Sequence, residues 1–353
     1  MTSTLDDPAA RARIDAAGML GVVERTAEQW AEAVRRALGA EGLPDAAGIA
    51  SVAVCGMGGS GIAGDVLQAI AAPRASIPVA VVKGYQLPSW VGPDTLCIFL
   101  SYSGNTEETL ACFKQAEARD ARLVVVSTGG ALAARATDRG VAVMTPVAGL
   151  QPRAAFASLV APVLIVAQRL GILDDVADEV AETEHVLRDR ARALGGDVPT
   201  ADNEAKRLAE RLDGGLPWIW GQDGILAAAA ARWRTQLNEN AKVPAISSVL
   251  PELDHNEIAG WDPGVAAMKD IVLVTLRDTD EHPRVATRIG LTLRAMSHRV
   301  GGIAEAYATG VSPLARLMSA VLLGDFTSVY LALRRGVDPT PVEALERVKN
   351  ELR

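Results

Sequence analysis

Residues 96–110 read LCIFLSYSGNTEETL, and they give the clearest indication of the fold class. Its first five residues form a continuous apolar run, which is typical of a fully buried strand, and a helical pattern occupies residues 106–118. The loop between them is rich in small and hydroxyl-bearing residues. An apolar strand that passes through a short loop into a helix is typical of a parallel sheet covered by helices on both faces.

The same alternation of strand and helix extends on both sides of this stretch. Further strands are predicted at residues 50–55, 78–82, 123–126 and 141–144, with helices at 61–71 and 131–138. After charged, alanine-rich helical sequence at residues 174–211, a second series is predicted, with strands at 216–220, 271–276 and 302–305 and helices from about 225 to 238 and over 282–300. We therefore predict an α/β protein with two subdomains, each a parallel β-sheet between layers of helices.

Helical sequence also lies outside these subdomains. Residues 26–38 place Trp30, Val34 and Leu38 on one face at helical spacing, and residues 313–353 read as consecutive helices with a break at 336–341. The predicted divisions are an N-terminal helical segment (1–45), a first α/β subdomain (46–195), a second one (196–310) and C-terminal helices that pack back on the core (311–353).

Composition and charge exclude several classes of protein. The 353 residues carry a formal net charge of −8, which argues against a general nucleic-acid binder because phosphate backbones require clustered Lys and Arg. The most apolar stretch, residues 154–167, is too short to span a bilayer, so a buried helix and no membrane partner are predicted. Residues 1–15 are polar and lack the apolar core of a signal peptide, so a cytoplasmic location is predicted.

The cysteines and histidines predict neither a disulfide framework nor a metal site. Cys55, Cys97 and Cys112 form no CxxC pair, and the first two lie inside predicted strands, which is typical of buried, reduced thiols. The four His residues lack the paired spacing of zinc ligands.

Three loops follow predicted strands, at the edge where open parallel sheets bind their ligands. The first, residues 55–65, reads CGMGGSGIAGD. Its glycines would let the backbone approach a ligand, and the next helix would offer free amides to an anion. A turn that needs small residues explains the pattern about equally well. A dinucleotide site is disfavoured, since Lys83 stands where that motif has an acidic residue.

The second loop, residues 101–109, carries three hydroxyls at Ser101, Ser103 and Thr106. Hydroxyls together with helix amides can bind a phosphate group. Helix N-capping is the alternative, but capping needs one such residue and this loop has several, so we favour phosphate binding. The third loop, STGG at residues 127–130, is expected to shape the wall of the site.

Three ionisable residues stand out, although none is decisive alone. Arg153 opens the apolar helix, where a cation is unfavourable to the helix dipole, so it is either solvated or faces an anion. Glu239 follows an apolar helix and could be tuned as a base, and His255 lies among carboxylates. Ordinary solvated or structural roles remain the more common explanation for each of these two.

Taken together, these segments resemble the bifunctional phosphoglucose/phosphomannose isomerases, which are built on sugar-isomerase (SIS) domains. The motif SYSGNTEET alone would indicate only an SIS fold, but further motifs over nearly the whole chain make the resemblance specific. The matching segments are GMGGSGIAGD (56–65), LPSWV (87–91), SYSGNTEETL (101–110), STGG (127–130), LQPRAA (150–155), NENAK (238–242), HNEIAGW (255–261) and GDFTSVYLALRRGVDPTPVEALERVK (324–349).

The resemblance implies interconversion of glucose-6-phosphate and mannose-6-phosphate with fructose-6-phosphate through a cis-enediol, without metal or cofactor. Glu239 would be the catalytic base, and Arg153 would stabilise the enediolate. His255 and Lys349 would assist ring opening, with the histidine reaching the site from the neighbouring subunit of a homodimer with shared active sites.

The resemblance also assigns the binding residues. Ser101, Ser103 and Thr106 would bind the phosphate of a small sugar phosphate, while Gly59 and Ser60 would line its sugar side.

Two other functions fit parts of the pattern. One is an SIS-domain isomerase of a different sugar phosphate, and the other is a non-catalytic sugar-phosphate-binding protein. A sensor would need the phosphate loops but not Glu239, His255 and Lys349 together, and no basic DNA-recognition helix is present in the sequence.

Overall fold

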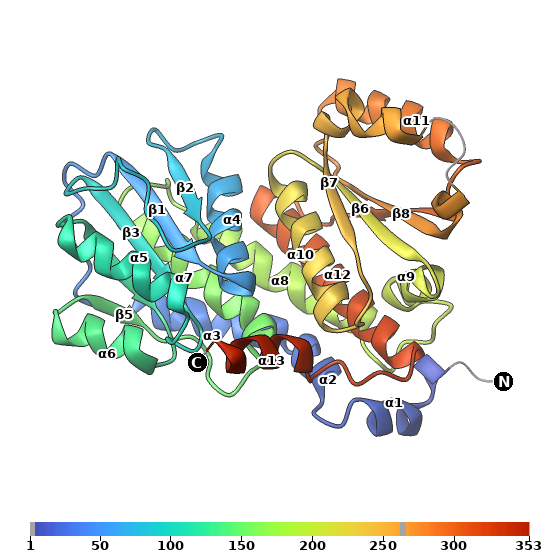
Figure 1. Cartoon of the computed structure of the whole chain (residues 1–353), viewed down its shortest axis with the longest axis horizontal. Helices are drawn as coiled ribbons and strands as arrows, with labels where there is room; N and C mark the ends of the chain where they lie inside the picture. The colour runs from blue at the N-terminus through green and yellow to red at the C-terminus, as the bar shows by residue number, and fades with distance from the viewer. Residues whose placement is uncertain (1–3, 262–265, 353) are drawn as a thin grey trace. The chain divides into compact units, whose positions relative to one another are not determined.

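The computed structural model describes residues 4–261 and 266–352, and the chain divides into two compact units. The first unit consists of Arg25–Arg188 and Gly310–Leu317. The second consists of the residues up to Glu24, of Asp189–Thr309 and of those from Met318 onward. Each unit has its own parallel sheet, so the predicted fold class of two α/β subdomains is confirmed (Figure 1).

The sheet of the first unit has five parallel strands in the order β2-β1-β3-β4-β5. The strands are β1 (Ser51–Gly56), β2 (Val79–Val82), β3 (Thr95–Leu100), β4 (Arg122–Val126) and β5 (Ala142–Met144). Each coincides with a predicted apolar run to within one residue at either end. The run at residues 96–100 lies in the centre of the sheet, which explains why it is apolar at every position rather than at alternate ones.

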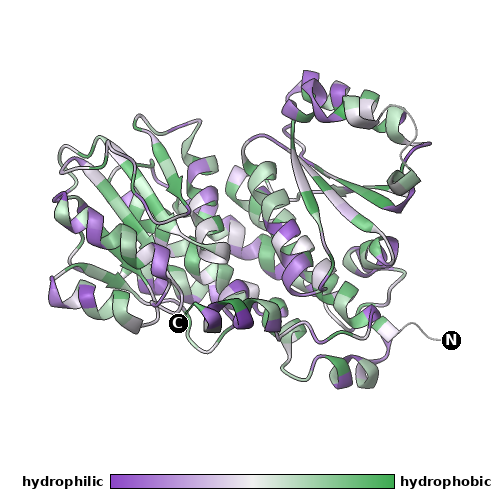
Figure 2. Cartoon of the chain, in the orientation of Figure 1, coloured by the Kyte–Doolittle hydropathy of each residue, from purple (hydrophilic) through white to green (hydrophobic). Residues whose placement is uncertain are grey.

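Helices cover both faces of this sheet. They are α3 (Thr26–Leu38), α4 (Gly58–Ala71), α5 (Glu107–Ala118), α6 (Gly130–Asp138) and α7 (Phe156–Arg169). Helices α5 and α6 pack on the face that carries Cys97 and Phe99, and α4 and α7 lie on the other face. Figure 2 shows the strands of this unit as largely hydrophobic, as burial on both faces requires.

Helix α3 has the predicted bounds but buries a slightly different face. Trp30 is fully buried, and its Nε1 donates to the carbonyl of Val180 at 3.1 Å. Ala33 and Ala37 are buried with it, whereas Leu38, predicted to lie on this face, is exposed. Leu38 lies one residue beyond Ala37, about 100° around the helix axis, and so falls outside the buried stripe.

The two most apolar helices are core helices. The stretch predicted as a buried helix forms α7, whose side chains are almost all inaccessible. Among the described residues, α12 (Pro313–Arg334) is the one helix long and apolar enough to cross a membrane, but its most apolar window is entirely buried inside the protein.

The sheet of the second unit has four parallel strands in the order β7-β6-β8-β9. The strands are β6 (Leu216–Gln222), β7 (Ile246–Leu250), β8 (Ile271–Arg277) and β9 (Gly302–Tyr307). The helices that lie wholly in this unit are α1 (Pro8–Ile14), α2 (Met19–Glu24), α9 (Glu204–Leu212), α10 (Ile225–Glu239), α11 (Pro283–Met296) and α13 (Glu343–Glu351). Helix α10 packs on one face of the sheet and α11 on the other, as Figure 1 shows. Helices α8 (Ala177–Leu194) and α12 contribute residues to both units.

Strand β7 is missing from the sequence prediction. Its sequence, ISSVL, has two serines in the middle, and only Ser248 and Leu250 are buried. It is an edge strand, paired with β6 alone, so one side of it needs no apolar partner and the apolar signal is weak.

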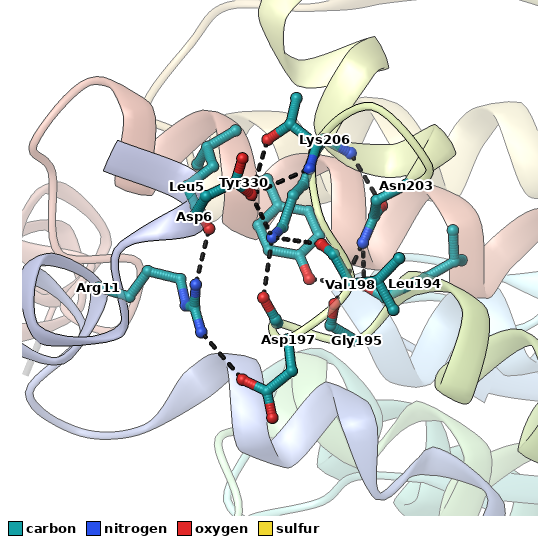
Figure 3. Close-up of polar contacts among 12 residues, drawn as sticks. Leu5, Asp6, Arg11, Leu194, Gly195, Asp197, Val198, Asn203, Lys206 and Tyr330 are labelled. Carbon is teal, nitrogen blue, oxygen red and sulfur yellow. Dashed lines mark hydrogen bonds and ion pairs between the residues drawn. The ribbon is translucent and has the colours of Figure 1, made fainter. Parts of the chain in front are cut away.

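Within the second unit, a buried lysine ties the N-terminal residues to α9 and to the segment before it (Figure 3). The side chain of Lys206 on α9 is fully buried, and its Nζ donates to Asp6 Oδ1 at 3.0 Å and to the carbonyls of Gly196 and Val198 at 2.8 and 2.7 Å. The same nitrogen lies 5.5 Å from the centre of the Tyr330 ring. Desolvation by burial lowers the pKa of Lys206. Because all three N–H groups have acceptors, this lysine is a structural anchor.

Candidate active site

Two of the predicted loops begin side by side at the carboxyl edge of the first sheet. Gly56 at the end of β1 is paired with Leu100 at the end of β3. A Cβ atom on Gly56 would lie 3.0 Å from the Leu100 carbonyl oxygen, and one on Gly61 would lie 2.7 Å from that of Gly56. Gly61 therefore has no room for a side chain within the tight turn, as the simpler interpretation of the first loop predicts, whereas a side chain at Gly56 would crowd the adjacent strand β3.

The rest of the first loop lies against Arg153. A Cβ atom on Gly59 would lie 3.4 Å from the Arg153 Cα, so the two backbones are in contact. Arg153 lies in the 3-10 helix Pro152–Ala155 that precedes α7, and it is only 4% exposed. This burial excludes a solvated arginine, and Ser60 beside Gly59 is buried as well. The structure thus brings Gly59, Ser60 and Arg153 together within the first unit.

In the second loop, the hydroxyls of Ser101 and Thr106 hydrogen-bond to each other at 2.9 Å. Thr106 is the N-cap residue of α5, yet its side chain makes no capping hydrogen bond within the part of the chain that the structure describes. Ser103 is exposed, and its hydroxyl accepts from the Asn105 amide at 3.3 Å. The hydroxyls therefore gather at the amino end of α5 without performing the N-capping that was the alternative to phosphate binding.

The third loop packs closely against the second. Gly104 has φ +68°, and a Cβ atom there would lie 1.7 Å from the Gly129 carbonyl oxygen. The amide of Ala131 donates to Asn105 Oδ1 at 3.0 Å, and a Cβ atom on Gly130 would lie 2.4 Å from the Ser103 carbonyl oxygen. Because the loops interlock this closely, residues 127–130 fix the shape of the hydroxyl-bearing loop, consistent with the expected wall.

Tyr102 links the second loop to the segment that leads to Arg153, a role the sequence did not reveal. Its buried hydroxyl donates to the Val147 carbonyl at 2.8 Å and accepts from the Leu150 amide at 2.9 Å. Desolvation by burial raises the pKa of Tyr102, so the hydroxyl keeps its proton for this bond. The only signal in the sequence is a single aromatic residue within a loop of small and polar ones.

In the second unit, Glu239 is the last residue of α10 and is half-buried. The next residue, Asn240, is fully buried and donates through Nδ2 to the Ser328 hydroxyl of α12 at 2.9 Å. About two turns before Glu239, Arg232 makes a two-pronged ion pair with Asp325 of α12, at 3.0 Å from Nε and 2.7 Å from Nη2. These bonds hold α10 against α12, and Glu239 lies between them at the end of α10.

His255 lies at the end of the 3-10 helix Glu252–His255 and is exposed. Its neighbour Asp254 has a buried side chain, which accepts a hydrogen bond from the Thr292 hydroxyl of α11 at 2.9 Å and lies 4.0 Å from Arg288. This carboxylate anchors the turn while the imidazole faces outward. Lys349 is exposed on α13.

The predicted site residues thus fall into two groups. The second unit holds Glu239, His255 and Lys349, each on a different element. The first unit holds the glycine loop, the hydroxyl loop and Arg153.

The described residues contain neither a group of metal ligands nor a disulfide. Across residues 4–261 and 266–352, no three His, Cys, Asp or Glu side chains lie together in a group that could hold a metal ion. Cys55, Cys97 and Cys112 are free and buried, as predicted for the first two. Desolvation by burial raises the pKa of Cys97 to about 12.

Comparisons with known proteins agree with this architecture. Residues 48–168 match the SIS domain family, and residues 201–352 match the family described as the bacterial phospho-glucose isomerase C-terminal SIS domain. A glucose-6-phosphate isomerase-like protein from Thermus thermophilus shares the fold with a TM-score of 0.66 at 21% identity, over 99% of both chains.

Two relatives are more similar in sequence. The bifunctional phosphoglucose/phosphomannose isomerase of Caldicellulosiruptor bescii is 40% identical over 86% of this chain and 90% of that protein. The bifunctional phosphoglucose/phosphomannose isomerase of Aquifex aeolicus is 34% identical over the same shares of the two chains. The chain described here belongs to the bifunctional phosphoglucose/phosphomannose isomerase family.

Proposed function

We propose that this protein interconverts glucose-6-phosphate and mannose-6-phosphate with fructose-6-phosphate, without a metal ion or cofactor. The observation that carries the proposal is the presence, in one chain, of hydroxyls gathered at a helix start and a half-buried glutamate at a helix end. Ser101, Ser103 and Thr106 supply the first feature, and Glu239 supplies the second. A non-catalytic sugar-phosphate binder would need only the first.

The phosphate of the substrate binds to the hydroxyl loop and to the first amides of α5. The first amides of a helix have no acceptor within it and carry the positive end of the helix dipole, so they favour an anion. Ser60 and the Gly59 backbone line the sugar, where a side chain at residue 59 would come against the Arg153 backbone.

Glu239 moves one proton between adjacent carbons. It removes the proton from C2 of the aldose phosphate, which leaves an enediolate with its negative charge on O1. A proton then passes from the 2-hydroxyl to O1, and Glu239 returns a proton to C1 to give fructose-6-phosphate. In the reverse direction the planar C2 of the enediol accepts the proton on either face, so one intermediate leads to both glucose-6-phosphate and mannose-6-phosphate. Arg153 stabilises the negative charge that develops on the enediol oxygen, and its burial strengthens that interaction.

Ring opening precedes the proton transfer and uses His255 and Lys349. We place these events in a cytoplasmic homodimer, in which His255 of each chain serves the site of the other. The exposure of His255 in the single chain supports this, since a histidine that serves a neighbouring subunit must lie at the surface.

The test of the proposed function uses purified protein, EDTA and fructose-6-phosphate, with glucose-6-phosphate and mannose-6-phosphate measured separately. The proposal predicts that both products form at comparable rates. Formation of one product alone would contradict the dual specificity. Binding of fructose-6-phosphate, seen as a raised melting temperature, without either product would favour the non-catalytic binder.

His255→Ala is expected to lower kcat/KM by about 10²-fold for the ring-closed substrates, as loss of one general acid–base group does. The effect on a substrate that cannot close its ring, such as the analogue of fructose-6-phosphate that lacks the 5-hydroxyl, should be much smaller. The measurement is kcat/KM of the wild type and of His255→Ala on each of the two substrates. Equal losses on both would remove His255 from ring opening.

Ser101→Ala is expected to raise KM for fructose-6-phosphate by about 10- to 100-fold, because a hydrogen bond to a charged group contributes roughly 1.5–3 kcal/mol. The matched control is Ser76→Ala, an exposed serine that precedes β2 in the same unit. Steady-state kinetics with both variants would decide, and a KM that changes equally in the two would refute the phosphate role of Ser101.

A further inference from the structure

Lys242, three residues after Glu239, has an unusual conformation and an unusual set of contacts. Its backbone has φ +54°, in the left-handed region that favours glycine. Its ammonium donates to the carbonyls of Glu239 at 2.8 Å and Asn240 at 3.3 Å, and to those of Asp338 and Pro339, both at 3.1 Å. One side chain therefore bonds to two separate parts of the second unit.

The first pair of carbonyls ends α10. The last carbonyls of a helix have no intrahelical donor and carry the negative end of the helix dipole, so a lysine there is favourable. A glycine would fit this backbone position without strain, but it would leave those carbonyls without the ammonium. Lys242 therefore stabilises the end of α10 through the hydrogen bonds of its ammonium, although its backbone conformation would favour glycine.

The second pair of carbonyls lies in the loop between α12 and α13. The beginning of this loop has its own support, because Arg334 at the end of α12 pairs with Asp213 at 2.9 Å. Within the loop, Asp338 Oδ1 accepts from the Thr340 amide at 2.8 Å. Beyond these local bonds, Lys242 ties the loop to the helix end that carries Glu239, and α13, which carries Lys349, begins four residues after Pro339.

We propose that Lys242 is a positioning residue, which holds the 335–342 loop and therefore α13 with Lys349 in a fixed place relative to Glu239. The inference rests on the proposed function for the roles of Glu239 and Lys349. Lys242 itself does not transfer the proton, since its ammonium is engaged by backbone carbonyls of the protein.

Lys242→Gly is the informative variant, because it removes the ammonium and also relieves the left-handed strain, so the fold is retained. Its matched control is Asp120→Gly, at an exposed residue in the first unit with the same φ of +54°. Lys242→Arg keeps a cation and should restore part of any loss.

The first readout is hydrogen–deuterium exchange, which does not depend on the proposed function. Lys242→Gly should accelerate exchange in peptides from residues 335–352 by about tenfold, the effect of losing hydrogen bonds to a charged group. Asp120→Gly should leave those peptides unchanged. Unchanged exchange in Lys242→Gly would overturn the inference, whatever the activity of the protein.

The second readout is a double-mutant cycle on ring-closed substrate. Lys242→Gly should lower kcat by about tenfold with little change in KM. Lys349→Met should then lower kcat much less in the Lys242→Gly background than in the wild-type protein. If the fold-losses in kcat of Lys242→Gly and Lys349→Met simply multiply in the double variant, the two residues act independently and the inference is overturned. Inactivity of the wild-type protein would instead contradict the proposed function, and the exchange experiment would still decide the role of Lys242.

Discussion

Glu239→Gln is expected to lower kcat for both aldose products by about 10³- to 10⁴-fold, at the upper end of what one general base contributes. The amide has the shape of the carboxylate but cannot accept a proton. Because Glu239 lies at the end of a helix whose neighbouring residues bond to α12, the substitution should not alter the fold. Fructose-6-phosphate should still bind, since we propose that its phosphate is held by the hydroxyl loop, away from Glu239.

The measurement combines kcat with calorimetric binding of fructose-6-phosphate. Glu41→Gln, an exposed residue in the loop after α3, controls for the loss of one negative charge and should match the wild type in both. A Glu239→Gln protein that retains most of its activity would remove Glu239 as the base.

Asp325→Ala is expected to have the largest effect on stability, about 3–5 kcal/mol, because it removes the carboxylate that pairs with a buried cation. Arg232 is 1% exposed and bonds to the two Asp325 carboxylate oxygens at 3.0 and 2.7 Å. The same substitution loosens α10 on α12, so kcat should also fall at temperatures where the protein is still folded.

Urea unfolding followed by tryptophan fluorescence measures this effect, because Trp233 on α10 is buried against α12 and its Nε1 donates to the Ala320 carbonyl at 2.8 Å. Asp197→Ala is the matched control. Its carboxylate lies 3.4 Å from Arg11 but is fully exposed, so its removal should leave the free energy of unfolding almost unchanged. An equally small cost for Asp325→Ala would show that the buried pair does not hold α10 in place.

The fold could be predicted from the sequence where local pattern and burial agree. The strands of the first unit are short apolar runs, and each lies in the structure within one residue of where the pattern predicts it. Strand β7 could not be predicted, because its pairing with β6 compensates for the two serines in its middle. The exposure of Leu38 depends likewise on which side of α3 meets the rest of the unit.

The candidate site was predicted less completely, because its residues are assembled by tertiary contacts. Sequence alone left Arg153 either solvated or facing an anion, and only its burial beside Gly59 excludes the first. It could not show that the Ser101 and Thr106 hydroxyls meet, nor that Tyr102 reaches residues 147–150. The contacts of Lys242 join parts of the chain almost 100 residues apart, and no local pattern encodes them.

Isomerisation in ²H₂O tests whether Glu239 transfers a proton through an enediol. Fructose-6-phosphate is incubated with the wild-type protein for many turnovers, and deuterium is then located by NMR in the recovered sugar phosphates. Because Glu239 is half-buried, the proton that it holds exchanges with solvent between removal and return, so solvent deuterium is expected at C2 of both glucose-6-phosphate and mannose-6-phosphate, and none in the same time with Glu239→Gln. Products that form without any solvent deuterium would contradict proton transfer by Glu239, because the hydrogen would then move directly between the two carbons.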